Sequence, residues 1–461
     1  MVTLRLISAR WVLPMVAPPI REGAVILDDE EQPLLGAAGE GRGDRSSSSA
    51  LVRVVGTRAE LRRAYPDVAE ERAQGVLLPA LVNAHAHLEL SELGGQVPGG
   101  DGLVKWTRRL AERLAARSDG GRGGPGPGSG EPSDSSDRSA ATATAAASAL
   151  AQARASGTGA LADVGNGTTG WCALEQSGMD GVFFHELVGS REARTGDALA
   201  DAASERAGIS KSARPTRIPA VAAPHAPYSV GRELMRRIFA AAAQAGRPTS
   251  IHLAEDEDEI LLLREGGGAW PAVLQALGVV DLRERGAARG VACSGPPATP
   301  TAYLASLGAF AAAPPPLLVH MVHATDEDRR RAQAAGATVV LCPRSNLHIG
   351  GRLAEVPALL ADGVHVAVGT DSLASVPNLS LWEEVATLAA HFPDVPPAVW
   401  LRAATRGGAV ALGWQRRGSL APGQRPGLLD VGLGGEGEGP KADPERELVS
   451  NGNPVVRWVA P

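Results

Sequence analysis

The stretch Val82-Asn83-Ala84-His85-Ala86-His87 ends an apolar run with two histidines, and it decides the fold. Alternate side chains of a β-strand lie on one face, so His85 and His87 can bind one ion together. Later apolar runs end in further residues of metal-binding or catalytic type, namely His252, His320 and Asp371. Polar residues at the ends of many strands are typical of the active site of an α/β barrel.

Composition limits the class of protein. The chain has 461 residues and a formal net charge of -6, and its arginines are scattered, whereas phosphate binding requires clustered positive charge. We therefore expect no nucleic-acid partner. No run reaches the ~18 apolar residues of a membrane span, so no membrane partner is expected. Three cysteines without metal spacing favour a reduced, cytoplasmic protein.

Eight strand-like runs alternate with Ala-rich segments, the order expected of repeated βα units. The expected strands cover residues 75–83, 159–164, 181–187, 218–223, 249–253, 317–322, 338–341 and 365–369. The expected helices that return over them include 140–155, 232–245 and 326–335. The pattern predicts an α/β fold with a (β/α)8 TIM-like barrel over residues 75–414.

The two chain ends predict a small β-sandwich domain. Residues 1–74 contain alternating runs, and residues 415–461 add two more short runs. Two inserts interrupt this organisation, at 28–49 in the first chain end and at 118–139 in the barrel. Both are poor in apolar residues and rich in Gly and Ser, so we expect them to be disordered.

Five motifs, in this order, resemble the amidohydrolase superfamily. They are residues 78–89 (LPALVNAHAHLE), 224–228 (PHAPY), 252–255 (HLAE), 342–346 (CPRSN) and 369–372 (GTDS). The resemblance is to the cytosine-deaminase-like and chlorohydrolase-like branch, which contains guanine, S-adenosylhomocysteine and aminodeoxyfutalosine deaminases. Two positions depart from the common pattern, Ala80 in place of Gly and Leu341 in place of His. Neither is a metal ligand in the family.

The resemblance implies one divalent ion, Zn²⁺ with Fe²⁺ as the alternative, because imidazoles and a carboxylate suit both metals. The implied ligands are His85, His87, His252 and Asp371. Such an ion lowers the pKa of bound water and so supplies a nucleophile at neutral pH. Relatives with two metals carry a lysine at the end of the fourth strand, whereas this chain has Pro224 and His225 there. A mononuclear site is therefore expected.

Three residues are implied as catalytic. Glu255 would carry protons between water and a ring nitrogen, His320 would hold the reacting oxygen by hydrogen bonding, and Asp371 would accept the proton of water. Glu255 opens the acidic run 255–259, which is usually a solvated face, and only Glu255 escapes that interpretation through its spacing from His252. His323 competes with His320 and is interpreted as a supporting residue.

Four residues are expected to bind substrate, namely His225, Arg344, Glu89 and Trp106. The motifs most resemble adenosine-type deaminases, which implies a 6-aminopurine nucleoside such as aminodeoxyfutalosine. That substrate carries a carboxylate remote from the purine, and Arg344 is the predicted anchor for it. The alternative for Arg344 is a brace for its own loop. An ordinary amphipathic helix would equally explain Trp106.

Other functions on the same site stay open at this point, because fold and ligands do not choose the substrate. They are a chlorohydrolase, a guanine or cytosine deaminase, an amide hydrolase and a scaffold without catalysis. The ligand set in the sequence is complete, which argues against the scaffold. The partner is expected to be a small-molecule substrate, and a homodimer is an open alternative to a monomer.

Overall fold

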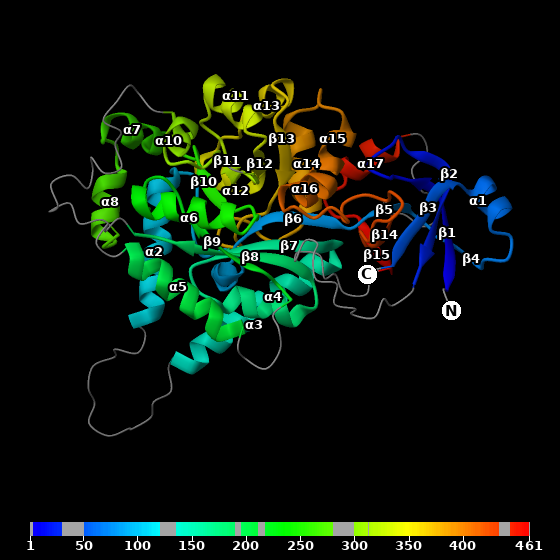
Figure 1. The fold of residues 1–461 in the computed structure, drawn as a ribbon, viewed down its shortest axis with the longest axis horizontal. Coiled ribbons are helices and arrows are strands. Elements are labelled where there is room, and N and C mark those ends of the chain that lie inside the picture. Colours follow the sequence, from blue (N-terminus) through cyan, green and yellow to red (C-terminus); the bar gives the residue numbers. More distant parts are fainter. Residues whose placement is uncertain are drawn as a thin grey trace.

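The computed structural model describes residues 3–29, 50–119, 135–189, 195–210, 217–279, 299–311, 313–432 and 443–460 (Figure 1). Most of the two predicted disordered inserts, 30–49 and 120–134, lies outside the described residues. The edges of both inserts are regular structure, because a strand extends to Asp28 and helices cover 118–119 and 135–139.

A seven-stranded sheet is built from both chain ends, so that the two termini lie at the same end of the molecule (Figure 1). Its strands are β1 (Leu4–Val12), β2 (Ile20–Asp28), β3 (Leu51–Thr57), β4 (Glu70–Arg72), β5 (Val76–Pro79), β14 (Leu428–Gly432) and β15 (Val455–Ala460). β5 joins the two ends, pairing with β1 on one side and antiparallel with β14 on the other. The described strands of the chain ends all belong to this one sheet, so a two-layer sandwich is not confirmed.

Eight parallel strands form two further sheets. One sheet has the order β6 (Leu81–Ala86), β7 (Thr158–Gly165), β8 (Asp180–Leu187), β9 (Ala220–Pro224). The other has the order β10 (Ser250–Leu253), β11 (Leu317–His320), β12 (Thr338–Leu341), β13 (His365–Val368). These eight strands match the eight predicted runs to within a few residues. The first run is divided at Ala80, where the chain passes from the terminal sheet into β6.

Backbone hydrogen bonds connect the two parallel sheets at both edges. His252 N donates to His225 O at 3.0 Å, beside the ends of β9 and β10. Asp371 N donates to His85 O at 3.1 Å, so the segment after β13 lies beside the end of β6. Both connections involve residues that the sequence predicts for the site. The carboxyl ends of the two sheets therefore meet where those side chains emerge.

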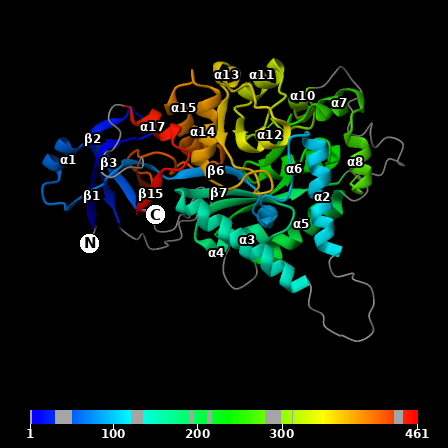
Figure 2. The ribbon, with the colours of Figure 1, turned by 180° about the vertical axis from the view of Figure 1, so that it is seen from behind.

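Helices cover the outer faces of the parallel sheets (Figure 2). The helices of this region are η1 (Leu88–Leu93), α2 (Leu103–Asp119), α3 (Ser135–Ala155), α4 (Thr169–Ser177), α5 (Thr195–Ser210), α6 (Arg232–Gln244), α7 (Glu257–Glu265), α8 (Trp270–Ala276), α10 (Pro300–Ser306), α11 (Asp326–Ala334), α12 (Pro343–Gly350), α13 (Val356–Ala361), α14 (Leu381–His391), α15 (Pro397–Arg402), η3 (Ala403–Gly407) and α16 (Gly408–Ala411). Of these, η1, α2 and α12 lie at the carboxyl ends of the strands rather than on the outer faces. α1 (Arg58–Ala64) and α17 (Pro444–Ser450) belong to the chain ends. The three predicted helices are confirmed as α3, α6 and α11. Their apolar faces pack on the strands, as the buried Leu234, Ile238 and Phe239 of α6 show.

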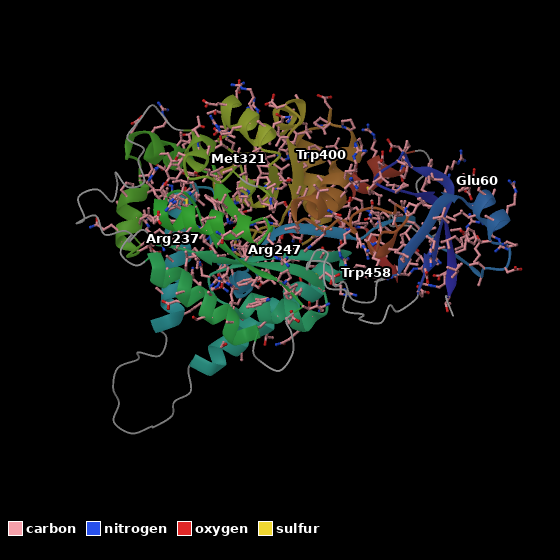
Figure 3. The ribbon with its side chains drawn as sticks, in the orientation of Figure 1. Glu60, Arg237, Arg247, Met321, Trp400 and Trp458 are labelled. Carbon is pink, nitrogen blue, oxygen red and sulfur yellow. The ribbon has the colours of Figure 1, made fainter. Side chains whose placement is uncertain are left out.

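Trp458, labelled in Figure 3, connects the terminal sheet with helix α3. The Trp458 indole on β15 donates to Arg154 O at 2.9 Å, and the Arg154 guanidinium lies 4.9 Å from the Trp458 ring centroid. Trp400 of α15 is fully buried in the main core.

Among the helices that the structure describes, none combines the length and apolar character needed to cross a membrane.

Candidate active site

Three histidines converge where β6 and β10 end. Ring centroids lie 4.8 Å apart for His85 and His87, 4.9 Å for His85 and His252, and 5.3 Å for His87 and His252. Their ligand atoms all fall within 4.8 Å of one another. Burial holds the pKa of His85 and of His252 well below the ordinary value, so both rings are neutral. Each can therefore donate a nitrogen lone pair to a metal ion. The predicted grouping of the three residues is therefore present in the structure.

The hydrogen bonds of these rings fit a bound cation. His252 Nδ1 lies 3.0 Å from His225 O, and a carbonyl only accepts, so the lone pair of His252 is on Nε2. That Nε2 lies 3.3 Å from His87 Nε2. Both nitrogens of the fully buried His85 ring lack a hydrogen-bond partner. A cation between the three rings would bind one nitrogen of each ring, and so would give the buried His85 a partner that a polar core alone does not supply.

Asp371 faces the same point. Its Oδ1 lies 3.5 Å from His87 Nε2 and 3.9 Å from His85 Nε2, while Ser345 Oγ donates to Oδ2. The close approach to β6 requires Gly369, because a Cβ there would come within 2.7 Å of His85 Cβ. Asp371 itself has a φ of +61°, and Ala254 and His320 also have positive φ. Such strain in non-glycine residues is common at functional sites.

Glu255 and His320 form the second part of the site. Glu255 Oε2 lies 3.5 Å from His320 Nε2, and burial, followed by the charge of Asp371, raises the pKa of Glu255 well above its ordinary value. Asn346 Nδ2 lies 3.0 Å from His320 Nδ1. An amide N–H donates, so Nδ1 accepts and the ring proton is on Nε2, which faces Glu255. Burial lowers the pKa of His320 to about 4, which keeps the ring neutral.

A cavity of ≈ 620 Å³ opens over these groups, a size typical of small-molecule sites. It is lined by His87, His252, Glu255, His320 and Asp371, and by three of the predicted substrate residues, His225, Glu89 and Trp106. Burial lowers the pKa of His225 to about 3, so this ring is also neutral. The Glu89 carboxylate accepts N–H bonds from Asn166 at 2.8 Å and Gly167 at 2.9 Å, which holds the loop after β7 at the cavity wall.

The model of the amidohydrolase family matches residues 76–433. The chain belongs to the amidohydrolase family. The match begins at β5 and includes all eight parallel strands, so the family region carries every residue of the cavity described above. The predicted superfamily is confirmed.

Several proteins that are similar to this chain are deaminases. The aminodeoxyfutalosine deaminase of Deinococcus radiodurans is 34% identical over 378 residues, which cover 78% of this chain and 79% of that protein. A 5-methylthioadenosine/S-adenosylhomocysteine deaminase of Caldanaerobacter subterraneus subsp. tengcongensis is 25% identical over 406 residues, 83% of this chain and 78% of that protein. The crystal structure of Helicobacter pylori aminofutalosine deaminase in complex with methylthio-coformycin superposes with a TM-score of 0.73 at 20% identity, covering 96% of this chain and 95% of that one.

Arg344 is the predicted substrate residue to which the structure gives another role. Its Nε donates to Glu384 at 2.7 Å, and the rest of the guanidinium contacts Glu383 and both the side chain and the carbonyl of Asn378. Arg344 is not among the residues that line the cavity. It therefore braces α12 against α14, which is the alternative stated for Arg344, and its placement gives the predicted substrate anchor no support. Its neighbours Ser345 and Asn346 are the residues of this motif that reach the site.

The acidic run after β10 is also misjudged by the sequence. Glu259 is fully buried, not solvated, and its carboxylate accepts from Ala254 N at 3.0 Å and Glu255 N at 3.2 Å. It thus fixes the backbone of Glu255. Burial raises the pKa of Glu259 to about 8. By contrast, the Glu257 side chain is 78% exposed, as the sequence predicts for the run.

Glu186 and Asp163 are site residues that the sequence analysis missed. Glu186 ends β8, lines the cavity and places Oε1 3.4 Å from His252 Nδ1. Asp163 of β7 is 1% exposed and accepts the backbone N–H of Leu88 at 2.9 Å, directly after His87. Burial raises the pKa of both carboxyls well above the ordinary value. An acidic residue inside an apolar strand run was the signal that would have found them.

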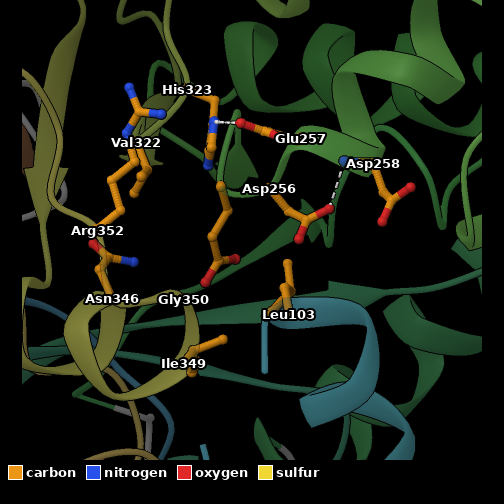
Figure 4. Close-up of a pocket in the computed structure, with 12 residues that line it drawn as sticks. Leu103, Asp256, Glu257, Asp258, Val322, His323, Asn346, Ile349, Gly350 and Arg352 are labelled. Atoms are coloured by element: carbon orange, nitrogen blue, oxygen red, sulfur yellow. Dashed lines mark hydrogen bonds and ion pairs between the residues drawn. The ribbon is translucent and has the colours of Figure 1, made fainter. Parts of the chain in front are cut away.

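A smaller cavity of ≈ 320 Å³ adjoins the first and shares Glu255 with it (Figure 4). His323 lines this cavity and pairs with Glu257 at 3.8 Å, and it is not among the residues that line the larger cavity. Of the two competing histidines, His320 is therefore the one that lines the cavity with His87, His252 and Asp371. The interpretation of His323 as a nearby supporting residue remains a prediction.

Proposed function

We propose that this amidohydrolase removes the exocyclic amine of a purine-type ring, with a 6-aminopurine nucleoside such as aminodeoxyfutalosine as substrate. The observation that carries the proposal is the placement of Glu255, a buried carboxyl with a raised pKa, beside the three histidines and Asp371 in one cavity. A chloride leaving group does not need a proton carrier, whereas a departing amine does. The 34% identical aminodeoxyfutalosine deaminase supports the same conclusion.

We propose one divalent ion, Zn²⁺, held by His85, His87, His252 and Asp371. The donor set supports this choice, because neutral imidazoles with one carboxylate suit Zn²⁺ and leave a position for water. When bound, the ion would supply a Lewis acid and a water of lowered pKa. The contact of Ser345 with Asp371 Oδ2 leaves Oδ1 directed at the histidines, which supports a single coordinating oxygen.

Each remaining group has a role that its contacts support. Asp371 accepts a proton from the attacking water, because its Oδ1 is directed at the point where the histidines converge. Glu255 gives its proton to the ring nitrogen next to the amine-bearing carbon, takes a second proton from the added hydroxyl and delivers that proton to the departing amine. The proton held by Asp371 then returns to Glu255, which restores both groups. His320 donates from Nε2 to the oxygen that adds to the ring, since its proton is held there by Asn346. The buried surroundings strengthen these interactions because little water screens them.

We extend the proposal to the residues that contact the substrate and to the closure of the barrel. His225, Glu89 and Trp106 line the same cavity and are proposed to contact the nucleoside. Hydrogen bonds at both edges of the two parallel sheets support one closed eight-stranded barrel, in which these residues stand at the carboxyl ends of the strands. A site of this kind takes a small molecule as its partner.

Ammonia release from a panel of adenosine, 5′-substituted adenine nucleosides, guanine and cytosine tests the proposal. The purified protein, loaded with Zn²⁺, should release ammonia from the adenine nucleosides and convert them to hypoxanthine nucleosides, seen as a change in ultraviolet absorbance. Asp371→Asn serves as the inactive control. Turnover of guanine or cytosine without any adenine nucleoside would refute the substrate assignment.

A further inference from the structure

One face of α2 forms a wall of the 620 Å³ cavity. The lining residues of this helix recur at helical spacing, as Leu103, Trp106, Thr107, Leu110, Leu114 and Arg117. At 1.5 Å per residue, Leu103 and Arg117 lie roughly 21 Å apart along the helix axis. The cavity therefore extends along most of the length of α2.

The two ends of this wall differ in chemistry. The first turn of α2 lies beside the catalytic groups, because Leu103 and Glu255 together line both cavities. At the last turn, Arg117 pairs with Glu92 of η1, and Thr142 Oγ1 of α3 donates to the same Glu92 carboxylate at 2.5 Å. The side chains of Arg117 and Glu92 are 30% and 18% exposed.

Charge singles out Arg117 further. It is the only Arg or Lys among the described residues that line the cavity, whereas the acidic lining residues are Glu89, Glu92, Glu186, Glu255 and Asp371. No other side chain among these lining residues offers an anionic group a permanent positive charge. Within the described lining of the cavity, only Arg117 offers a planar guanidinium that a carboxylate of a ligand could share with Glu92.

The stretch between the two ends is apolar and partly open. Leu114 and Val188 line the cavity and are each 42% exposed, although large apolar side chains are usually buried. Leu110 lies between Trp106 and Leu114 on the same helix face. An apolar or aromatic part of a ligand would cover these side chains and remove them from water.

We propose that Arg117 binds an anionic group on the substrate, remote from the reacting amine and joined to the nucleoside by an apolar spacer on Leu110, Leu114 and Val188. This inference rests on the proposed function, because the nucleoside sets which end of the substrate reaches Glu255. Glu92 holds the guanidinium at the wall and also competes with the ligand for it. Arg117 thus takes the selectivity role that the sequence analysis gave to Arg344.

Two matched nucleosides test the inference, 5′-S-(3-carboxyphenyl)-5′-thioadenosine and its neutral 3-carbamoylphenyl counterpart. The measured quantity is the ratio of kcat/KM for the carboxylate over the carboxamide. In Arg117→Met this ratio should fall at least about tenfold, a moderate loss because the side chain is partly exposed. Arg113→Met is the matched control, since Arg113 is exposed on the same helix and does not line the cavity, and its ratio should equal that of the wild type.

Two further measurements make the outcome decisive. Glu92→Gln removes the competing acceptor, so the ratio should rise. Calorimetric binding of both nucleosides tests the anion site independently of the reaction. If the wild type releases no ammonia but binds the carboxylate more tightly than the carboxamide, and Arg117→Met loses this preference, the proposed function is refuted and this inference is kept. An Arg117→Met ratio equal to that of the wild type, in turnover and in binding, would overturn the inference and leave Arg117 a brace between α2 and η1.

Discussion

Replacing Glu255 by Gln isolates proton transfer from metal binding. Gln keeps the shape of the side chain but carries no titratable proton. The Glu255 side chain is 7% exposed, so bulk water cannot readily take over its role, and its contact in the site is His320 at 3.5 Å. A general acid/base contributes roughly 10²- to 10⁴-fold, and 10²-fold corresponds to about 2.7 kcal/mol of barrier. We therefore expect kcat to fall at least ~10²-fold.

The assay pairs steady-state ammonia release with metal analysis of the same preparation. Glu255→Gln should keep the metal content of the wild type, because the three-histidine cluster does not include Glu255. Glu257→Gln is the matched control, two residues away with a side chain that is 78% exposed, and it should retain wild-type kcat. Loss of the metal in Glu255→Gln would show that Glu255 is a ligand. A kcat equal to that of Glu257→Gln would refute its role as proton carrier.

Three further changes test other parts of the site. The purified protein should bind about one divalent ion per chain, and His87→Ala should lose both the ion and turnover by metal analysis and ammonia release; two tightly bound ions would contradict this. Folded Glu259, with its pKa of about 8, keeps a proton that the unfolded chain releases near pH 4.5, so the free energy of unfolding should fall as pH rises between these values. Denaturant unfolding across this window should show the free energy of unfolding falling by up to ~1.4 kcal/mol per pH unit, and this decrease should be smaller in Glu259→Gln. Arg344→Met should lower the free energy of unfolding by ~3 to 5 kcal/mol, because it strands the buried Glu384, and should not change the carboxylate-to-carboxamide ratio; unchanged stability would contradict the brace.

The parts of the site that lie on strands were predictable from sequence. A strand alternates its faces with a period of two, so His85 and His87 had to point the same way, and the ends of parallel strands had to meet. His252, His320 and Asp371 follow apolar runs in the same manner. The structure brings all five together, although the metal itself is a proposal.

Residues on helices and loops were harder to predict, because their direction depends on packing. In Pro343-Arg344-Ser345-Asn346, the sequence favoured the charged residue as the functional one. α12 instead turns Arg344 toward Glu383 and Glu384 of α14, and directs Ser345 and Asn346 to Asp371 and His320. Consecutive residues on a helix, such as Arg344 and Ser345, point in different directions. Their spacing in the sequence does not show which of them points into the active site.

The acidic run shows why charge alone misleads. Glu257 and Glu259 have the same side chain and stand two residues apart, yet one is exposed and the other fully buried. The difference arises because Ala254 turns with a φ of +51°, which frees the backbone N–H groups of Ala254 and Glu255 to bond to the Glu259 carboxylate. The backbone of Glu255, the proposed proton carrier, is therefore held in place, while its side chain stays available to the cavity. Glu259 is a positioning residue on this argument, and substituting it should displace Glu255 without touching any of the proposed metal ligands.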